Sequence, residues 1–230
     1  MWKPQARFLL DGVESFFPLP AQQAAPMFEW GLNWCVASRA LGFLVMHAGM
    51  LSKSGEALMM PGFPGSGKST LCASLCFLAG WRLLSDELAI LDPASGEMLP
   101  HPRPISLKNN SIEIVARLPA AAIGPTYVDT RKGTISHAYS QPGSTFAADA
   151  GAPVRWVVFP KFSQDVRGKI SEISRAEAFS LISEQSFNQE RMGDTGFTAL
   201  CNMLSAANCY QIVYGSTQEG LHLIREVTDT

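Results

Sequence analysis

The stretch "MMPGFPGSGKSTLC", residues 59–72, decides the fold, because an apolar run leads into a glycine-rich turn and then into the start of a helix. The pattern G-x-x-x-x-G-K-[ST] of phosphate-binding loops is satisfied by Gly62, Gly67, Lys68 and Ser69. Glycines let the backbone N–H groups turn inward around an anion, the lysine supplies a mobile positive charge, and the serine hydroxyl is a ligand for Mg²⁺. The sequence therefore predicts a phosphate-binding loop between a strand and a helix.

The composition excludes several classes of protein. The chain has 230 residues, 47% hydrophobic and 17% charged, which suits a globular domain with a sizeable core. Its net charge of -2 argues against nucleic-acid binding, and its apolar runs are too short to cross a bilayer. The first residues lack the features of a secretory signal. We therefore expect a cytoplasmic protein without nucleic-acid or membrane partners.

The cysteines are odd in number and form no CxxC pair, which favours free thiols in a reducing compartment. They are Cys35, Cys72, Cys76, Cys201 and Cys209. Cys72 and Cys76 are four residues apart on the helix predicted after the loop. They should share one face of it and pack in the core rather than bind a metal.

The segments around the loop alternate between strand and helix patterns. Two apolar runs at 43–51 and 55–62 are separated by "SKSG", which predicts a hairpin, and the loop helix should end near Gly80. "WRLLSDELAILDP", 81–93, predicts a strand, a polar interruption, a second strand and a turn. An upstream helix over 24–42 should place its two tryptophans, Trp30 and Trp34, in the core.

The rest of the chain divides into a weakly patterned middle and a regular end. Residues 101–110 and 129–144 are basic and loop-like, with a helix predicted between them at 110–118. Strands are predicted at 154–160, 168–174 and 210–215, and helices at 174–187, 194–208 and 216–227. Ser174 with Glu177, and Ser216 with Glu219, have capping-box spacing. This alternation predicts an α/β fold with a helix-flanked sheet, in which residues 1–42 pack on a domain of residues 43–230.

Two adjacent acids follow the strand after the loop helix. Asp86 and Glu87 end the apolar run "RLL", where a carboxylate can hold Mg²⁺ or accept the proton of an attacking hydroxyl. The alternative is a pair of ordinary turn acids. His47 falls on the strand expected beside the loop strand and could reach the carboxylate, although a lone histidine on an apolar strand is usually a core residue. His101, His137 and His222 are expected to be structural.

The strings "HAGMLSKSGEALMMPGFPGSGKSTLCASLCFLAGWRLLSDELAILDP", "RPISLKN", "DTRKGT" and "RWVVFP" together resemble the HPr-kinase-related kinase A group, relatives of bacterial HPr kinase/phosphorylase. The resemblance covers nearly the whole chain. It implies a single P-loop domain with a strongly bent mixed sheet flanked by helices, as in HPr kinase and phosphoenolpyruvate carboxykinase. It also implies an ATP- and Mg²⁺-dependent kinase that phosphorylates a hydroxyl group.

The resemblance assigns roles to particular residues. It makes Asp86 the general base, His47 its helper and Lys68 a catalytic cation, with Ser69 and Glu87 as metal ligands. ATP would be bound by Gly62, Pro64, Gly65, Ser66, Gly67, Lys68, Ser69 and Thr70. The basic residues Arg103, Lys108, Arg131 and Lys132 of the middle region suit a clamp on the transferring phosphoryl group, with a solvated basic loop as the alternative.

This chain departs from the HPr kinases at two positions of the motif. Thr70 stands where they carry an acid after "GKS", and Glu87 stands where their second acid is an aspartate. We therefore expect an acceptor other than HPr, namely a hydroxyl of a peptide, another protein or a small molecule. Relatives occur beside a PqqD-like peptide-binding protein and a nucleotidyltransferase, which are candidate partners, and the chain could form a homo-oligomer. A non-catalytic ATP-binding switch and a simple ATPase remain the alternatives to a kinase.

Overall fold

The glycine-rich loop, residues 62–67, joins strand β6 (Glu56–Pro61) to helix α2 (Lys68–Ala79) in the computed structural model, as the sequence predicts. β6 pairs antiparallel with β5 (Leu44–Lys53) through the predicted hairpin. α2 ends at Gly80, whose φ of 70° is the left-handed conformation that glycine adopts readily after a helix. The strand–loop–helix unit is therefore confirmed.

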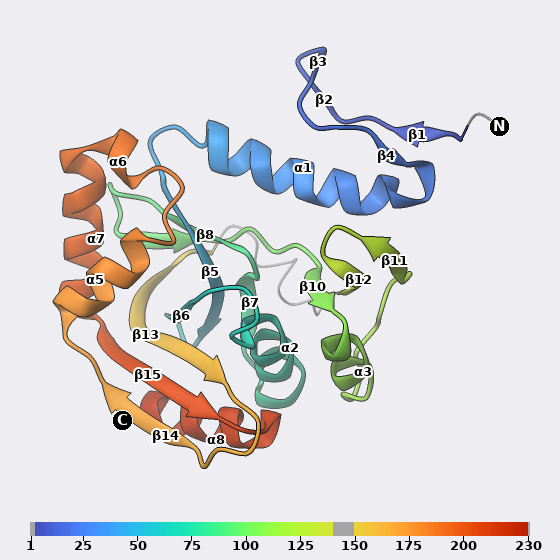
Figure 1. Cartoon of the computed structure of the whole chain (residues 1–230). Helices are drawn as coiled ribbons and strands as arrows, with labels where there is room; N and C mark the ends of the chain where they lie inside the picture. The colour runs from blue at the N-terminus through green and yellow to red at the C-terminus, as the bar shows by residue number, and fades with distance from the viewer. Residues whose placement is uncertain (1–2, 140–149, 230) are drawn as a thin grey trace.

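An eight-stranded mixed sheet forms the centre of the molecule, of which the structure describes residues 3–139 and 150–229. Its other strands are β7 (Arg82–Ser85), β8 (Leu88–Leu91), β9 (Glu97–Leu99), β13 (Ala152–Phe162), β14 (Lys169–Glu172) and β15 (Asn208–Tyr214). The strand order is β14-β15-β13-β6-β5-β8-β9, and β7 also pairs with β5. Figure 1 shows β14, β15 and β13 side by side at one end of this order. β9 pairs with both β8 and the start of β13, so β13, β6, β5, β8 and β9 form a closed ring of pairings.

Helices cover the two faces of this sheet. They are α5 (Arg175–Ser183), α6 (Gln189–Met192) and α7 (Asp194–Ala206), which contribute to one core, and α2 with α8 (Thr217–Thr228), which contribute to the other. Along β6 the side chains alternate between the two cores, as the period of a strand requires. Ser174 and Ser216 each accept a bond from the backbone N–H of the glutamate three residues on, which confirms both caps. The fold is mixed α/β.

The acid pair lies where β5 changes partner. The first half of β5 pairs with β8, with His47 opposite Leu88, and the second half pairs with β7, with Met50 opposite Ser85. Asp86 and Glu87 connect β7 to β8 and therefore lie beside the middle of β5. Because β6 occupies the other edge of β5, the acids are held near the start of α2.

The middle region is more regular than predicted. It forms β10 (Ile105–Lys108), α3 (Asn110–Ala116), β11 (Tyr127–Thr130) and β12 (Gly133–Ala138), and the three strands make an antiparallel sheet. The prediction of loops was wrong at 105–108, 129–130 and 133–138, while its end, 140–144, lies outside the described residues. Such short strands carry too few apolar residues to produce a pattern, since only Ile105 and Leu107 of β10 are buried.

The N-terminal segment is built around helix α1 (Ala24–Arg39), which ends three residues earlier than predicted. Before it come β1 (Gln5–Ala6), β2 (Leu9–Leu10), β3 (Val13–Glu14), β4 (Leu19–Pro20) and the 3₁₀ turn η1 (Ala21–Gln23). In Figure 1, α1 crosses the body from the side of α6 to the side of β11. Two hydrogen bonds join the ends of α1 to the body. Arg191 donates to the carbonyl of Ala37, and the Gln23 side chain donates to the carbonyl of Asp129.

Two expectations about buried residues have different outcomes. The prediction that the tryptophans lie in the core was wrong. Trp34 packs on Phe16 but is 39% exposed, and Trp30 is half-buried beside Lys132. All five cysteines are free, and both cysteines of α2 are buried, as predicted. Among the described residues, no helix combines the length and the apolar character needed to cross a membrane.

Candidate active site

The glycine-rich loop adopts backbone conformations that glycine favours. Gly65 and Gly67 have φ of 88° and 95°, and a side chain at Gly67 would overlap the hydroxyl of Tyr214. The carbonyl of Gly67 accepts the first bond of α2, from Leu71 N at 3.0 Å. The free N–H groups at the start of α2 therefore adjoin the loop, which is the arrangement that attracts an anion.

Lys68 turns its side chain back over this loop. Its ammonium donates hydrogen bonds to the carbonyls of Gly62 and of Phe63, the latter at 3.2 Å. Lys68 is only 7% exposed, and burial lowers its pKa while the charge of Asp86 opposes that shift. An ammonium has three donors, so a third remains for a group in the cavity beside it.

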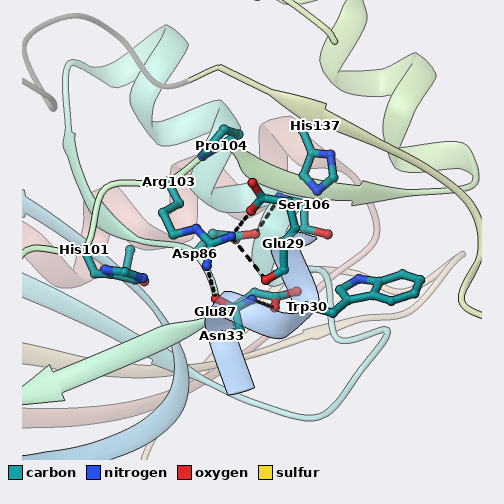
Figure 2. A pocket seen from close by; sticks show the side chains of 11 residues that line it. Glu29, Trp30, Asn33, Asp86, Glu87, His101, Arg103, Pro104, Ser106 and His137 are labelled. Atoms are coloured by element: carbon teal, nitrogen blue, oxygen red, sulfur yellow. Dashed lines mark hydrogen bonds and ion pairs between the residues drawn. The ribbon is translucent and has the colours of Figure 1, made fainter. Parts of the chain in front are cut away.

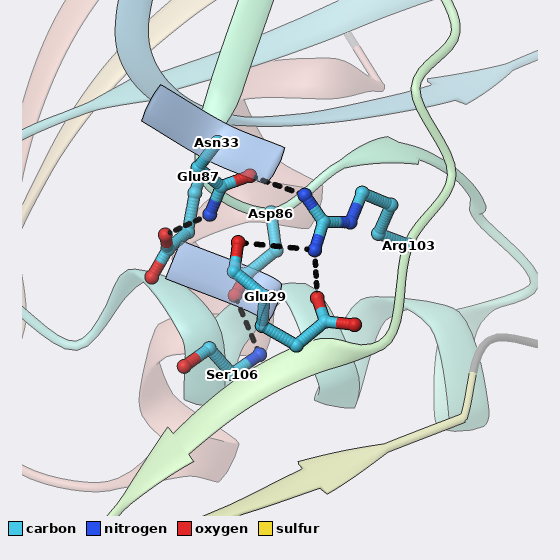
Figure 3. Close-up of polar contacts among 6 residues, drawn as sticks. All are labelled: Glu29, Asn33, Asp86, Glu87, Arg103 and Ser106. Carbon is cyan, nitrogen blue, oxygen red and sulfur yellow. Dashed lines mark hydrogen bonds and ion pairs between the residues drawn. The ribbon is translucent and has the colours of Figure 1, made fainter. Parts of the chain in front are cut away.

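Asp86 is buried at the end of β7 and faces α2. Its Oδ2 atom accepts hydrogen bonds from Ser69 Oγ at 3.1 Å and from Ser106 N at 2.9 Å (Figure 3 shows the second). Its Oδ1 atom is buried and has no hydrogen-bond partner within the described residues. The carboxylate thus contacts the serine of the loop motif and still has one free acceptor atom.

The environment makes Asp86 an unusual acid. Burial raises the pKa of its carboxyl to about 7, and the charge of Glu87 acts in the same direction. The bonds from Ser106 and Ser69, and the charge of Lys68, pull the pKa the other way. A carboxyl with a pKa near 7 can take up and release a proton at neutral pH, as a general base must.

Glu87 is held from helix α1. Asn33 Nδ2 donates to Glu87 Oε2 at 2.7 Å, and Asn33 Oδ1 accepts from Arg103 at 2.7 Å (Figure 3). Arg103 also forms an ion pair with the Glu29 carboxylate and donates to the Glu29 carbonyl at 3.2 Å. One side chain of α1 therefore bridges Glu87 and an arginine–glutamate pair.

His47 contacts the backbone of the acid pair. Its Nδ1 lies 3.0 Å from the carbonyl oxygen of Glu87, and because a carbonyl only accepts, that nitrogen carries the proton. Burial lowers the pKa of His47, with Lys68 adding to the effect, so the ring is neutral at pH 7. The resemblance implied a helper for Asp86, whereas this hydrogen bond goes to the main chain of the second acid.

A cavity of about 710 Å³ brings most of the predicted residues together. Its lining includes His47, Pro64, Gly65, Gly67, Lys68, Ser69, Thr70, Asp86, Glu87, Lys108 and Lys132. Gly62, Ser66, Arg103 and Arg131 are not among its described lining residues. Gly62 instead binds Lys68 through its carbonyl, and Arg131 is exposed.

Arg103 lies in a second, small cavity behind Asp86. Figure 2 shows the lining side chains of this space, which has a volume of about 20 Å³, enough for about one water molecule. Asp86, Glu87 and Ser106 line both cavities. His101 lines the small cavity too, and its Nε2 atom is buried without a partner in the described part of the chain. Arg103 thus contacts the acid pair indirectly, through Asn33, which donates to Glu87.

Several residues of the site were missed by sequence reasoning. They are Glu29, Asn33, Ser106, Asn110, Ser111, Ile114, Phe162, Phe187, Tyr214 and Thr217. Glu29 and Asn33 are four residues apart, so they share a face of α1, and this polar pair within the mostly apolar first three turns of the helix was a usable signal. The aromatic residues carry no such signal, because their spacing is that of ordinary strands and loops.

The comparisons with known proteins leave the assignment to this geometry. No protein-family model matches the chain, and a search of curated proteins finds no match. Within 3–139 and 150–229, no three His, Cys, Asp or Glu side chains gather closely enough to hold a metal ion by themselves. A metal ion at Ser69 and the acid pair would therefore need further ligands from water or a bound phosphate.

Proposed function

We propose that this protein is an ATP- and Mg²⁺-dependent kinase that phosphorylates a hydroxyl group, with Asp86 as the general base. The observation that carries the proposal is the Asp86 carboxylate. It is buried, contacts the serine of the loop motif, has one unpartnered oxygen and has a pKa of about 7. These are the properties of a base that acts beside a phosphate-binding loop.

The residues present are compatible with ATP as the substrate. Loop amides from Gly65 to Thr70 and the third donor of Lys68 would bind the β- and γ-phosphates. The Ser69 hydroxyl and the Glu87 carboxylate would hold Mg²⁺, which when bound supplies positive charge to the phosphate oxygens. The oxygen-only character of these donors suits this hard cation.

The transfer needs a base, Asp86, and positive charge beside the phosphates, which Lys68 would supply in place of the clamp expected from Arg103, Lys108, Arg131 and Lys132. Asp86 takes the proton of the acceptor hydroxyl while a bond forms between that oxygen and the γ-phosphorus. The bond from the γ-phosphorus to the oxygen bridging the β-phosphate breaks, and ADP leaves. Asp86 then releases its proton to solvent. His47 is neutral and fixes the main chain of Glu87, and so supports the acid pair by orientation.

The resemblance to HPr-kinase-related kinases supports the same proposal independently of the geometry. The resemblance extends the proposal to a single P-loop domain of the HPr kinase/phosphoenolpyruvate carboxykinase type in the cytoplasm. It also suggests a serine-type acceptor on a peptide, a protein or a small molecule, with a PqqD-like protein and a nucleotidyltransferase as partners. The closed ring of strand pairings is compatible with a strongly bent sheet.

Labelled ATP tests the proposal directly. The full chain is incubated with γ-labelled ATP, Mg²⁺ and a native cell extract, and phosphorylated products are identified by mass spectrometry. Asp86→Asn should lower transfer by about 10² to 10⁴-fold, while nucleotide affinity changes less than about threefold. For wild type, kcat/KM should rise with pH and level off above about pH 7, because the base must be deprotonated.

A matched control is Asp165→Asn, which removes an exposed carboxylate at a left-handed residue where asparagine is equally suitable. It should leave transfer unchanged. Release of inorganic phosphate without any labelled acceptor would instead identify an ATPase that activates water. Nucleotide binding without turnover would identify a switch protein. Either result would overturn the kinase proposal.

A further inference from the structure

Two lysines in the large cavity form no ion pair with a carboxylate of the described residues. Lys108 lies at the end of β10 and Lys132 in the turn between β11 and β12, and both line the cavity. Neither ammonium lies within 4.0 Å of an acidic group in the part of the chain that the structure describes. Lys132 instead lies over the Trp30 ring, 5.2 Å from its centroid. Two unpaired cations in one cavity are the usual preparation for an anionic ligand.

The position of Lys108 indicates which ligand that is. The backbone N–H of Ser106 donates to Asp86, and Lys108 is two residues further along β10 on the same face. Two residues of a strand span about 7 Å, so the backbone of Lys108 lies about 7 Å along β10 from the Ser106 N–H that contacts Asp86. A small molecule can span that distance. An acceptor that gives its proton to Asp86 must lie against Asp86, and β10 therefore borders the acceptor.

The nucleotide phosphates would be bound by other positively charged or polarised groups. Lys68 and the N-terminal amides of α2 belong to the loop side of the cavity, and Lys68 is held there by the carbonyls of Gly62 and Phe63. The nucleotide phosphates would be met by these groups. Lys108 and Lys132 come from the three-stranded sheet of β10, β11 and β12, which contributes no residue to the loop.

We infer that the phosphoryl acceptor carries an anionic group of its own, a carboxylate or a phosphate, which Lys108 and Lys132 bind while the hydroxyl faces Asp86. This inference rests on the proposed kinase function and narrows its substrate class. The anion is unchanged in the reaction, and the bonds formed and broken are those of the transfer to the hydroxyl described above. The ring of Trp30 stabilises the Lys132 ammonium through a cation–π contact.

Matched pairs of charged and neutral acceptors test this inference. They also distinguish an anionic group on a small molecule from one on a peptide. Glycerate and glycerol 3-phosphate are compared with glycerol for a small molecule. A serine peptide with aspartates beside the serine is compared with the same peptide carrying alanines. The charged member of at least one pair should be phosphorylated with a KM at least tenfold below that of its neutral counterpart. The pair that responds identifies the source.

Lys108→Met and Lys132→Met remove the charges but keep the length of the side chains. Each should raise KM for the charged acceptor about tenfold, leave KM for the neutral acceptor unchanged and change KM for ATP less than about threefold. Lys169→Met, an exposed lysine at the edge strand β14, is the control and should change none of these. A rise in KM for ATP alone, or equal use of charged and neutral acceptors, would overturn the inference while the kinase function stands.

Binding measurements keep the inference testable without turnover. Calorimetry with the non-hydrolysable nucleotide AMP-PNP present should show binding of a charged acceptor to wild type and to Asp86→Asn. The Lys108→Met/Lys132→Met double variant should bind it at least 50-fold more weakly, at an unchanged affinity for AMP-PNP. Equal binding of glycerate, glycerol 3-phosphate and the acidic peptide by the double variant and wild type would refute the anion site, whatever the outcome for transfer.

Discussion

The cavity has two sides that are built in different ways. One side comes from the continuous segment 64–70, which is the end of the loop and the first turn of α2, and all of its residues except Ser66 line the cavity. The other side combines Asp86 and Glu87 with Lys108, Lys132 and the residues of α1 behind them, from segments far apart in the chain. Asn33 is 54 residues from Glu87 and 70 from Arg103, yet contacts both.

The difference determines what holds each side in place. The loop side is shaped by backbone conformation, since glycines in left-handed geometry and the first turn of α2 define it. The assembled side is shaped by polar side-chain contacts across tertiary structure. We therefore expect backbone substitutions to damage the first side most, and side-chain truncations to affect the second by smaller, separable amounts.

The largest effect is expected from Gly67→Ala. Its φ of 95° would strain an alanine, and the new Cβ would overlap the Tyr214 hydroxyl and lie 3.3 Å from the Cβ of Phe162. Strain and overpacking together should cost about 4 kcal/mol in the free energy of unfolding, measured by chemical denaturation. Nucleotide binding should be lost as well.

Gly65→Ala is the matched control, because φ is 88° there but nothing lies within 4 Å of an added Cβ. It should lose only about 1 kcal/mol, from backbone strain. Adding Tyr214→Phe to Gly67→Ala should restore part of the stability, since the ring carbon left behind is 3.2 Å away. Equal losses at the two glycines would show that packing against Tyr214 contributes nothing.

The same division explains what the sequence could predict. The glycine-rich loop, the hairpin of β5 and β6, both caps and the acid pair each depend on contiguous residues or on the alternation of strands and helices. Their positions were predicted, whereas the hydrogen bond between Asp86 and the loop serine was found only in the structure. His47 was expected beside the acids because a hairpin fixes the neighbour of its strand, and it contacts Glu87 there.

Contacts between distant segments could not be predicted. Nothing in the sequence pairs Asn33 with Glu87, or directs Arg103 to Glu29 rather than to the cavity. Trp30 was expected in the core because aromatic residues at helical spacing usually are, but α1 buries only a narrow stripe, with Pro26, Met27 and Gly31. Each of these side chains is positioned by a residue that is distant in the sequence, and a single sequence does not show which distant residues come into contact.

An intermediate effect is expected for Asp86→Asn, measured as stability against pH. The carboxyl has its pKa raised from 3.8 to about 7 in the folded protein, so the folded state keeps a proton that the unfolded chain has lost. Stability from this group is therefore present at low pH and is lost as pH rises through about 7. Asparagine carries no charge, and its oxygen can still accept from Ser69 and Ser106.

The pKa shift from 3.8 to about 7 is worth about 4 kcal/mol of stability between pH 4 and pH 8. The amide N–H that replaces Oδ1 would be buried without a partner, which costs about 1 to 2 kcal/mol. Asp86→Asn should therefore be more stable than wild type by about 2 to 3 kcal/mol at pH 8 and less stable by about 1 to 2 kcal/mol at pH 4. Thermal or chemical unfolding at both pH values measures the difference. The Asp165→Asn control should show no such pH dependence. If Asp86→Asn is less stable than wild type at pH 8, the carboxylate is a favourable part of the folded state, and burial does not dominate its pKa.

The smallest effect is expected on the assembled side, from Asn33→Ala. The change removes the donor to Glu87 and one acceptor of Arg103, which keeps its ion pair with Glu29. Losing these bonds should cost about 1 to 2 kcal/mol of stability. Because Glu87 would be less well oriented, we expect kcat to fall about 5- to 10-fold and the Mg²⁺ concentration for half-maximal rate to rise.

The Mg²⁺ dependence separates positioning from mere stability. Asn202→Ala, at an exposed position of α7, is the control and should leave both kcat and the Mg²⁺ requirement unchanged. Asn33→Asp keeps the size of the side chain and its contact with Arg103 but places a carboxylate against Glu87, so it should raise the Mg²⁺ requirement beyond that of the alanine variant. If both Asn33 variants lose stability with the Mg²⁺ requirement unaltered, then α1 only fastens the N-terminal segment to the body, and Glu87 is oriented by its own strand connection.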